Sequence, residues 1–253
     1  MNPISTKELE LYEKPESDLN DDVPIPLSEH LNDLRNKIII SLLVLLITTS
    51  IGFYLSKGII SLLTEAAPEG TTFLQIKPGE FFFCSMRVAF YFGVALALPV
   101  IIWQLGSFIV PGLKPKEKNI IIPILSGAPI LFCIGSMFAY YFVIPSMLNF
   151  LFGFGKDVIS TSISIESFVS FSLLIMAIFG FCFLLPIVIF ALSNVGILNS
   201  EILISKWRYA ILSSVILGAV LTPTPDPFNM GVVSGILIAL YFLSWGVLKL
   251  TRR

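Results

Sequence analysis

The residues best placed to do chemistry lie in a charged stretch from Leu27 to Ile38, directly before the first long apolar run. On an α-helix its leucines share one face, and Glu29, Asp33 and Lys37 share the opposite face. Asp33 therefore points away from the apolar stripe, and Lys37 is the partner that an i,i+4 spacing offers it. Arg35 falls at the edge of the stripe. The pattern predicts a short interfacial helix that presents carboxylates beside a membrane.

Two simpler interpretations of these carboxylates stay open from the local pattern alone. The stretch before the first apolar run can be a juxtamembrane anchor whose charges are only solvated. Glu117, which stands three residues before the run that begins at 120, lies among three lysines at 114, 116 and 118. It can be a solubilising charge in a basic loop.

The composition places the chain in the class of integral membrane proteins. Of its 253 residues 55% are hydrophobic and 13% charged, and the mean hydropathy is +0.89. Residues 1–26 form an acidic tail that we expect to be disordered, followed by one membrane domain over residues 27–250. The acidic start resembles neither a cleavable signal nor a transit peptide, so we expect insertion without removal of a presequence.

Six apolar runs carry no Asp, Glu, Lys, Arg or His across their middle and predict six transmembrane helices. We therefore expect an all-α polytopic protein. The fifth run has only 13 residues and the sixth 18, so this last pair is predicted to be too short for a full bilayer. The runs are 38–55, 88–110, 120–144, 168–193, 209–221 and 231–248.

The basic residues near the run ends predict the orientation. Ten lie on the side that holds the N-terminus and four on the other, which predicts both termini on the cytosolic or stromal side. Prolines inside the runs predict kinked helices that form a concave, cup-like wall. We expect short helices in the two long outer connections, 56–87 and 145–167.

Several function classes are disfavoured by what the sequence lacks. An ion-coupled small-solute transporter needs an ionisable group at membrane depth, whereas all 17 acids and the single histidine lie outside the apolar runs. An intramembrane enzyme needs an activated nucleophile or a metal cluster, and the sequence shows no such set. The three cysteines have no metal-ligand spacing, and no phosphate-binding loop is present. We expect no catalytic residues, no metal and no cofactor.

The stretch from His30 to Arg35 reads H-L-N-D-L-R and resembles the H-L-x-E-L-R signature of TatC, the polytopic receptor component of the twin-arginine protein translocase. The likeness extends over most of residues 25–250, and its details resemble the cyanobacterial and plastid branch. It is carried further by K-P-G-E-F-F at 77–82, F-I-V-P-G-L at 108–113, K-W-R-Y at 206–209 and L-T-P-T-P-D-P at 221–227.

The resemblance implies a receptor for folded precursor proteins whose signal peptides carry two adjacent arginines. Implied partners are single-span TatA- and TatB-type proteins, other copies of the chain, precursors and the lipid bilayer, with no nucleic acid. The proton gradient would supply the energy. The implied location is the plastid thylakoid membrane, with a bacterial plasma membrane as the alternative.

The resemblance also assigns roles to individual residues. Signal binding falls on the carboxylates of Asp33 and Glu117, with Arg35 and Phe108 beside them; planar carboxylates suit guanidinium groups. Asp33 stands where the family usually has Glu, so it has one methylene less of reach. Weaker assignments fall on His30, Leu31, Pro111 and Asp226.

Two further positions carry specific expectations. Asp226 before Pro227 is predicted to cap a helix, because Asp suits the N-cap and Pro the first helical position. Leu184 stands where many family members have Glu or Gln before a proline in the fourth span. The sequence therefore leaves open whether the polar contact with a single-span partner survives at Leu184.

Overall fold

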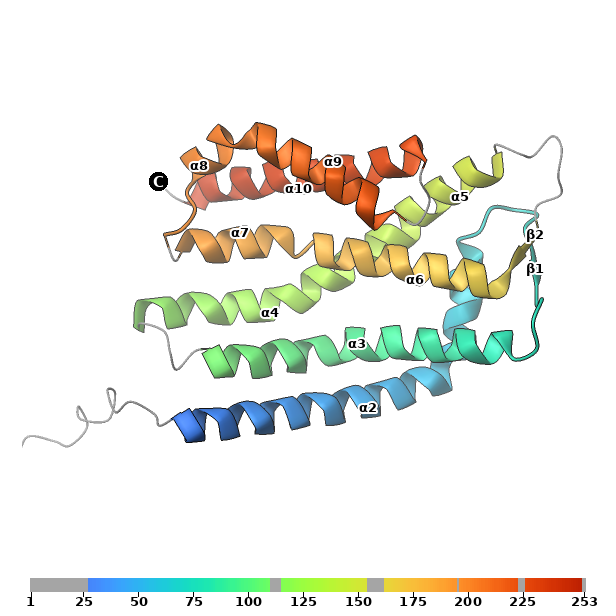
Figure 1. The fold of residues 1–253 in the computed structure, drawn as a ribbon, viewed down its shortest axis with the longest axis horizontal. Helices are drawn as coiled ribbons and strands as arrows, with labels where there is room; N and C mark the ends of the chain where they lie inside the picture. The colour runs from blue at the N-terminus through green and yellow to red at the C-terminus, as the bar shows by residue number, and fades with distance from the viewer. Residues whose placement is uncertain (1–26, 110–114, 154–161, 195, 223–225, 252–253) are drawn as a thin grey trace, which may run out of the picture. The chain divides into compact units, whose positions relative to one another are not determined.

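The structure, a computed structural model, describes residues 27–109, 115–153, 162–194, 196–222 and 226–251 (Figure 1). The chain forms two compact units, residues 1–36 and 37–253. Its elements are α2 (Leu27–Glu65), β1 (Thr72–Leu74), α3 (Glu80–Ile109), α4 (Pro115–Phe138), the π-helix η3 (Ala139–Val143), α5 (Ile144–Gly153), β2 (Ser162–Ser164), α6 (Ile165–Cys182), α7 (Leu185–Asn194), α8 (Ser200–Ser205), α9 (Trp207–Leu221) and α10 (Pro227–Thr251).

The prediction of an all-α polytopic membrane protein is confirmed. Within the described residues, five helical stretches are long and apolar enough to cross a membrane. They are Leu31–Glu65, Glu80–Phe108, Leu125–Gly153, Ile165–Asn194 and Pro227–Thr251.

The last two helices differ in length. The apolar helix α9 has 15 residues and is about 22 Å long, short of a bilayer core of about 30 Å, as its short apolar run predicted. The prediction that the sixth run is also too short is wrong, because α10 has 25 residues and is about 37 Å long. The first turn of α10 contains Asn229, a polar residue that lies outside the apolar run in the sequence. In the structure Asn229 is fully buried.

The short interfacial helix predicted before the first span is not a separate element. Residues 27–38 are the start of α2, a single helix of 39 residues. No proline interrupts this stretch, so the backbone hydrogen bonds of the helix continue across the predicted membrane boundary.

The prediction of short helices in the outer connections is confirmed for 145–167, where the 10-residue helix α5 (Ile144–Gly153) lies, whereas the described residues of 56–87 contain no separate short helix. In 56–87, α2 continues to Glu65, and β1 pairs with β2 in a parallel two-stranded sheet. Thr72 lies opposite Ser162, and their hydroxyl oxygens are 2.7 Å apart. Strand pairing thus joins the two connections to each other, although the paired residues are 90 positions apart in the sequence.

The predicted effect of proline is visible in the fourth span. α6 ends at Cys182 and α7 begins at Leu185, so the helix breaks just before Pro186, which has no backbone N–H to donate. Pro99 is accommodated inside α3. Between α4 and α5 the third span contains one turn, η3, whose backbone hydrogen bonds are π-helical instead of α-helical.

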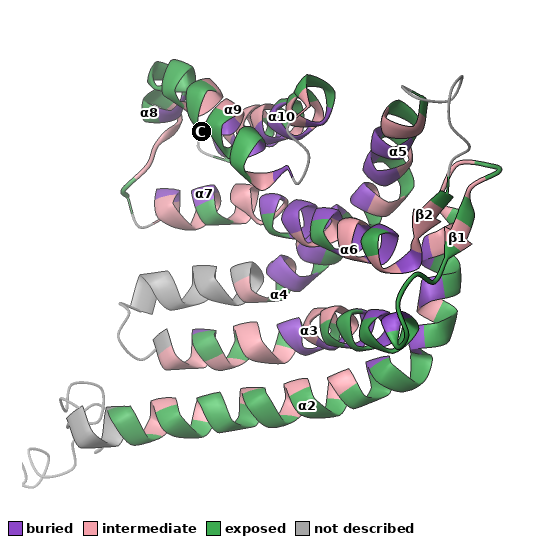
Figure 2. Cartoon of the chain, turned by 45° about the vertical axis from the view of Figure 1, so that its right-hand side comes forward, coloured by how far each residue is buried: buried purple, intermediate pink, exposed green. Residues whose placement is uncertain are grey.

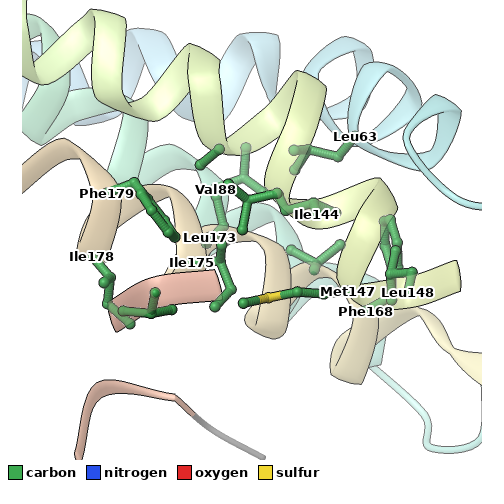
Figure 3. Close-up of a cluster of buried hydrophobic side chains, with 14 of the residues drawn as sticks. Leu63, Val88, Ile144, Met147, Leu148, Phe168, Leu173, Ile175, Ile178 and Phe179 are labelled. Carbon is green, nitrogen blue, oxygen red and sulfur yellow. The ribbon is translucent and has the colours of Figure 1, made fainter. Parts of the chain in front are cut away.

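The core of the second unit lies where α3, α5, η3 and α6 meet (Figure 3). Val88, Ile144 and Phe168 are fully buried there, and Leu63 from the far end of α2 packs against them. In contrast, large apolar side chains along the preceding part of α2 are exposed (Figure 2). A surface of this kind is stable only in lipid, which agrees with the membrane class.

Two glycines let α2 and α3 approach closely. A Cβ at Gly93 would lie 2.8 Å from the backbone N of Thr49, and one at Gly52 would lie 2.7 Å from the carbonyl oxygen of Ala89. Thr48 Oγ1 donates to the carbonyl oxygen of Gly93 at 2.9 Å. Small residues and an interhelical hydroxyl bond are how helices associate in lipid, where burial of apolar surface contributes little.

The orientation stays a prediction and has a direct test. Single cysteines in place of Lys206 and Lys77, in a chain whose native cysteines are serines, should react with an impermeant maleimide from opposite sides of sealed vesicles. Position 206 is expected on the cytosolic or stromal side, because it lies on the side with ten basic residues. Labelling of both positions from one side would contradict the predicted topology.

Candidate functional site

The predicted signal-binding residues of the first unit lie on the first turns of α2. Leu31 and Arg35 are exposed, and Asp33 is half-buried. His30 belongs to the helix, and its side chain lies outside the described residues. The helical backbone confirms the periodicity on which the placement of Asp33 opposite the leucines was based.

Two predicted residues of the second unit, Phe108 and Glu117, belong to the end of α3 and the start of α4. Phe108 is half-buried in the last turn of α3, and the ammonium of Lys37 lies 5.7 Å from the centroid of its ring. This cation–π contact links α2 to the end of α3 and is worth about 0.5 to 1 kcal/mol at an exposed site. Pro111 falls outside the described residues.

Glu117 is in a helix, whereas the sequence pattern predicted a loop. α4 begins at Pro115, which suits the first helical position, so Glu117 lies in the first turn. A carboxylate there is stabilised by the positive end of the helix dipole. The side chain of Glu117 lies outside the described residues, and its joint action with Asp33 stays a prediction.

A second polar centre, at the opposite end of α3, was not predicted from the sequence. Glu80, the first residue of α3, is only 2% exposed, and its carboxylate accepts four hydrogen bonds. Oε2 accepts from the backbone N–H groups of Ile76 at 2.7 Å and Lys77 at 3.0 Å. Oε1 accepts from the hydroxyl of Ser164 and from the N–H of Glu166 at 3.0 Å.

The Glu80 carboxylate therefore joins two outer connections that are far apart in the sequence. It closes the turn before α3 and also satisfies a backbone donor at the start of α6, where Ser164 is the N-cap. The K-P-G-E motif contained a signal for this role, because it places an acid directly after a glycine. In the structure Gly79 has a φ of +80°, which favours glycine, and Glu80 begins a helix.

Arg87 extends this network along α3. Its guanidinium lies 2.9 Å from Oε1 of Glu166 and donates to the hydroxyl of Ser170, both on α6. Together with the sheet and Glu80, this ion pair holds the start of α6 against α3. The ends of these two helices that lie next to the two-stranded sheet are thus cross-linked by polar contacts, while their middles pack through apolar side chains.

Asp226 has the structural role that its local sequence predicted. Its Oδ2 accepts from the N–H of Asn229 at 2.8 Å, and its Oδ1 accepts from the side-chain amide of the same residue at 2.9 Å. Pro227 is the first residue of α10. The N-cap prediction for Asp226 is confirmed; a direct part in signal binding stays a prediction.

Leu184 lies at the break between α6 and α7 and lines a largely apolar cavity of about 510 Å³. Phe181 and Leu185 flank it on the same chain segment, and Leu217 and Leu237 face it from α9 and α10. No charged side chain lines this cavity among the described residues. Any partner helix that binds here must pack against apolar side chains.

The described residues contain no group of three or more His, Cys, Asp or Glu side chains that could hold a metal ion.

The comparisons with known proteins all find the same family. The family model described as Sec-independent protein translocase protein (TatC) matches residues 29–235. The Sec-independent protein translocase protein TatC of Synechocystis sp. is 38% identical over 91% of this chain and 90% of its own length. The chloroplastic TATC protein of Arabidopsis thaliana is 34% identical over 96% of this chain and 72% of its own length. An uncharacterized tatC-like protein, ycf43, of Porphyra purpurea is 37% identical over 92% of this chain and 91% of its own length.

Solved structures match the fold as well. A crystal structure of the twin-arginine translocase receptor TatC in the detergent DDM superimposes with a TM-score of 0.76 and 32% identity, covering 87% of this chain and 99% of that one. A second crystal structure of the same receptor gives a TM-score of 0.74. The chain therefore belongs to the TatC family: it is a multi-pass component of the Sec-independent protein translocase of a thylakoid or bacterial membrane, a transport protein that works with other Tat subunits and not an enzyme.

Proposed function

We propose that this chain is the receptor of the translocase and binds twin-arginine signal peptides through Asp33 and Glu117. The observation that carries the proposal is the retention of a carboxylate at both positions, next to predicted membrane boundaries that are otherwise rich in lysine and arginine. Lysine and arginine repel a cationic ligand, so one carboxylate beside Arg35 and Lys37 and another among three lysines select where such a ligand binds.

The chemistry favours arginine over lysine in the ligand. A guanidinium offers parallel N–H donors that match both oxygens of a carboxylate, whereas an ammonium is a single point charge. The Phe108 ring lies 5.7 Å from the Lys37 ammonium, which shows that this aromatic face at the end of α3 accommodates positive charge. The proposed site thus combines two carboxylates with an aromatic face.

Assembly with TatA- and TatB-type single-span proteins and with further copies of this chain, driven by the proton gradient, completes the proposal. The family membership supports it, since the chain works with other Tat subunits.

Crosslinking of a precursor to this chain in membranes tests the receptor role. A photo-reactive residue beside the two arginines of the signal should crosslink to the chain, and replacing both arginines by lysines should reduce the yield about tenfold or more, the loss of about 1.4 kcal/mol. Equal yields with paired lysines would contradict the proposed recognition. A precursor with its arginines intact but its cargo exchanged is the matched control, and it should crosslink unchanged.

The apolar cavity at Leu184 gives a second prediction. If a partner helix binds there, Leu184→Ala should lower partner crosslinking by no more than about threefold, because the cavity keeps ten other lining residues. Leu184→Gln should be tolerated, since the position is half-buried at a helix break and not in the fully buried core. Disulfide crosslinking between cysteines in the partner and in α9 measures both. Complete loss of export in Leu184→Gln would contradict this prediction.

A further inference from the structure

Three exposed cations near the end of α10 each lie over an aromatic ring. Lysine and arginine side chains held in this way have lost part of their rotamer freedom before any ligand arrives. We call these three cations the basic corner. They are Lys206, whose Nζ is 5.5 Å from the Tyr209 ring, Arg208, whose Cζ is 5.7 Å from the Trp207 ring, and Lys249, whose Nζ is 5.2 Å from the Trp245 ring.

The packing of α8 against α10 places the start of α9 beside the last turns of α10. Tyr241 Oη donates to the carbonyl oxygen of Leu203 at 2.7 Å, so the turn from α8 into α9 lies beside the last turns of α10 (Figure 1). Lys249 is two turns beyond Tyr241, but its ammonium leans back over Trp245. Its charge therefore lies close to the level at which α9 begins.

The local charge is strongly one-sided. Among the described residues from 196 to 251, the acids are Glu201 in α8 and Asp226 at the opposite end of α10. The basic corner therefore sets three cations against one exposed carboxylate. Tryptophan and tyrosine at this level are typical of the headgroup region of a bilayer, where an amphipathic ring contacts both lipid and water.

An exposed apolar stripe leads away from the basic corner along α9. Tyr209, Leu212, Ile216 and Val220 follow each other at helical spacing, and each is more than half exposed, from 55% to 75%. A ligand that is anionic at one end and aliphatic over the length of about three helical turns matches both features. A free phosphate ion would match only the cations.

We propose that the basic corner and the stripe on α9 bind one anionic lipid, with its phosphate or sulfonate group on Lys206, Arg208 and Lys249 and an acyl chain along Leu212 and Ile216. This binding is separate from signal recognition, because it uses α9 and α10 and neither Asp33 nor Glu117. It ties the last two helices to the membrane, which the short α9 needs because its 15 residues do not span the bilayer.

Tryptophan fluorescence tests the proposal, since the chain has only three tryptophans. In a Trp103→Phe protein reconstituted in nanodiscs, Trp207 and Trp245 report on the site. Phosphatidylglycerol brominated on its acyl chains should quench them at a mole fraction about a hundredfold lower than brominated phosphatidylcholine, because each of the three cations contributes about fivefold. Each removed cation should lower that preference by about fivefold, the effect of one basic residue near an anionic surface, and the Lys206→Gln, Arg208→Gln, Lys249→Gln protein should show none.

Three controls show whether the quenching arises from a specific lipid site at the basic corner. Lys57→Gln with Lys77→Gln removes exposed cations elsewhere and should leave the preference unchanged, and Lys206→Arg with Lys249→Arg should retain it. Quenching by brominated phosphatidylcholine should stay at the wild-type level in every variant, which shows that the variant is folded and inserted. Equal quenching by the two lipids in the wild-type protein, or displacement of phosphatidylglycerol by soluble glycerol phosphate, would overturn the proposal.

Discussion

Glu117→Arg is expected to abolish crosslinking of a twin-arginine signal, whereas Glu117→Gln should lower it by about tenfold to a hundredfold. A hydrogen bond that involves a charged group contributes about 1.5 to 3 kcal/mol, and an arginine at 117 adds repulsion to this loss. Asp33→Asn should cost less than Glu117→Gln, because the aspartate side chain is one methylene shorter than the usual glutamate. The losses from Asp33→Asn and Glu117→Gln should not add, because both carboxylates serve one ligand.

A charge-swapped ligand is the sharpest check on this expectation. A signal with one arginine replaced by glutamate should regain binding to the Glu117→Arg protein and lose it with the wild type. Abundance and insertion of each variant are measured in parallel, and Glu201→Gln, which removes an exposed acid from α8, is the matched control. Undiminished crosslinking in the Asp33→Asn, Glu117→Gln double variant would refute carboxylate recognition and leave the start of α2 as a solvated juxtamembrane segment.

Glu80→Gln is expected to separate the first turns of α3 and α6 without unfolding the rest of the protein. The amide keeps one acceptor oxygen, but its NH2 cannot accept, so two of the four donors around Glu80 lose their partner. Leaving such donors unsatisfied costs about 1 to 3 kcal/mol each, so the local free energy of opening should fall by at least about 2 kcal/mol. This corresponds to an increase on the order of thirtyfold in the population of the open form.

Buried cysteines make this opening measurable. Cys84 is fully buried one turn after Glu80, and Cys182 is buried at the other end of α6. In a Cys133→Ser background, Glu80→Gln should raise the rate at which a thiol-reactive dye labels Cys84 by about thirtyfold and leave Cys182 nearly unchanged. Glu69→Gln removes an exposed acid from the same connection and should alter neither rate. An equal increase at both cysteines would indicate global unfolding, and no increase at Cys84 would show that the carboxylate contributes no local stability.

The sequence by itself determined the features that depend on hydropathy added over neighbouring residues and on contacts between residues a few positions apart. Membrane insertion is governed by transfer free energy added over a run of residues, so the apolar runs located helices in the structure without knowledge of their packing. The cap at Asp226 involves a residue three positions away, and the break before Pro186 involves a missing donor on the proline itself. The family motifs are likewise short contiguous stretches, so the order of residues alone was enough to indicate the TatC family.

Only the tertiary structure decided the features in which distant segments meet. Glu80 binds donors at 164 and 166, β1 pairs with β2, and Arg87 pairs with Glu166, all across more than 75 residues. No local pattern encodes such contacts, because a charged residue near the end of an apolar run has the same sequence signature whether it is solvated or buried with partners. The apolar run understated the length of α10, although the cap predicted at Asp226 had already indicated where this helix begins; the burial of Asn229, which hydropathy leaves outside the run, is visible only in the structure. Burial exchanges water for protein partners, and which partners are available is set by packing rather than by the neighbouring residues in the chain.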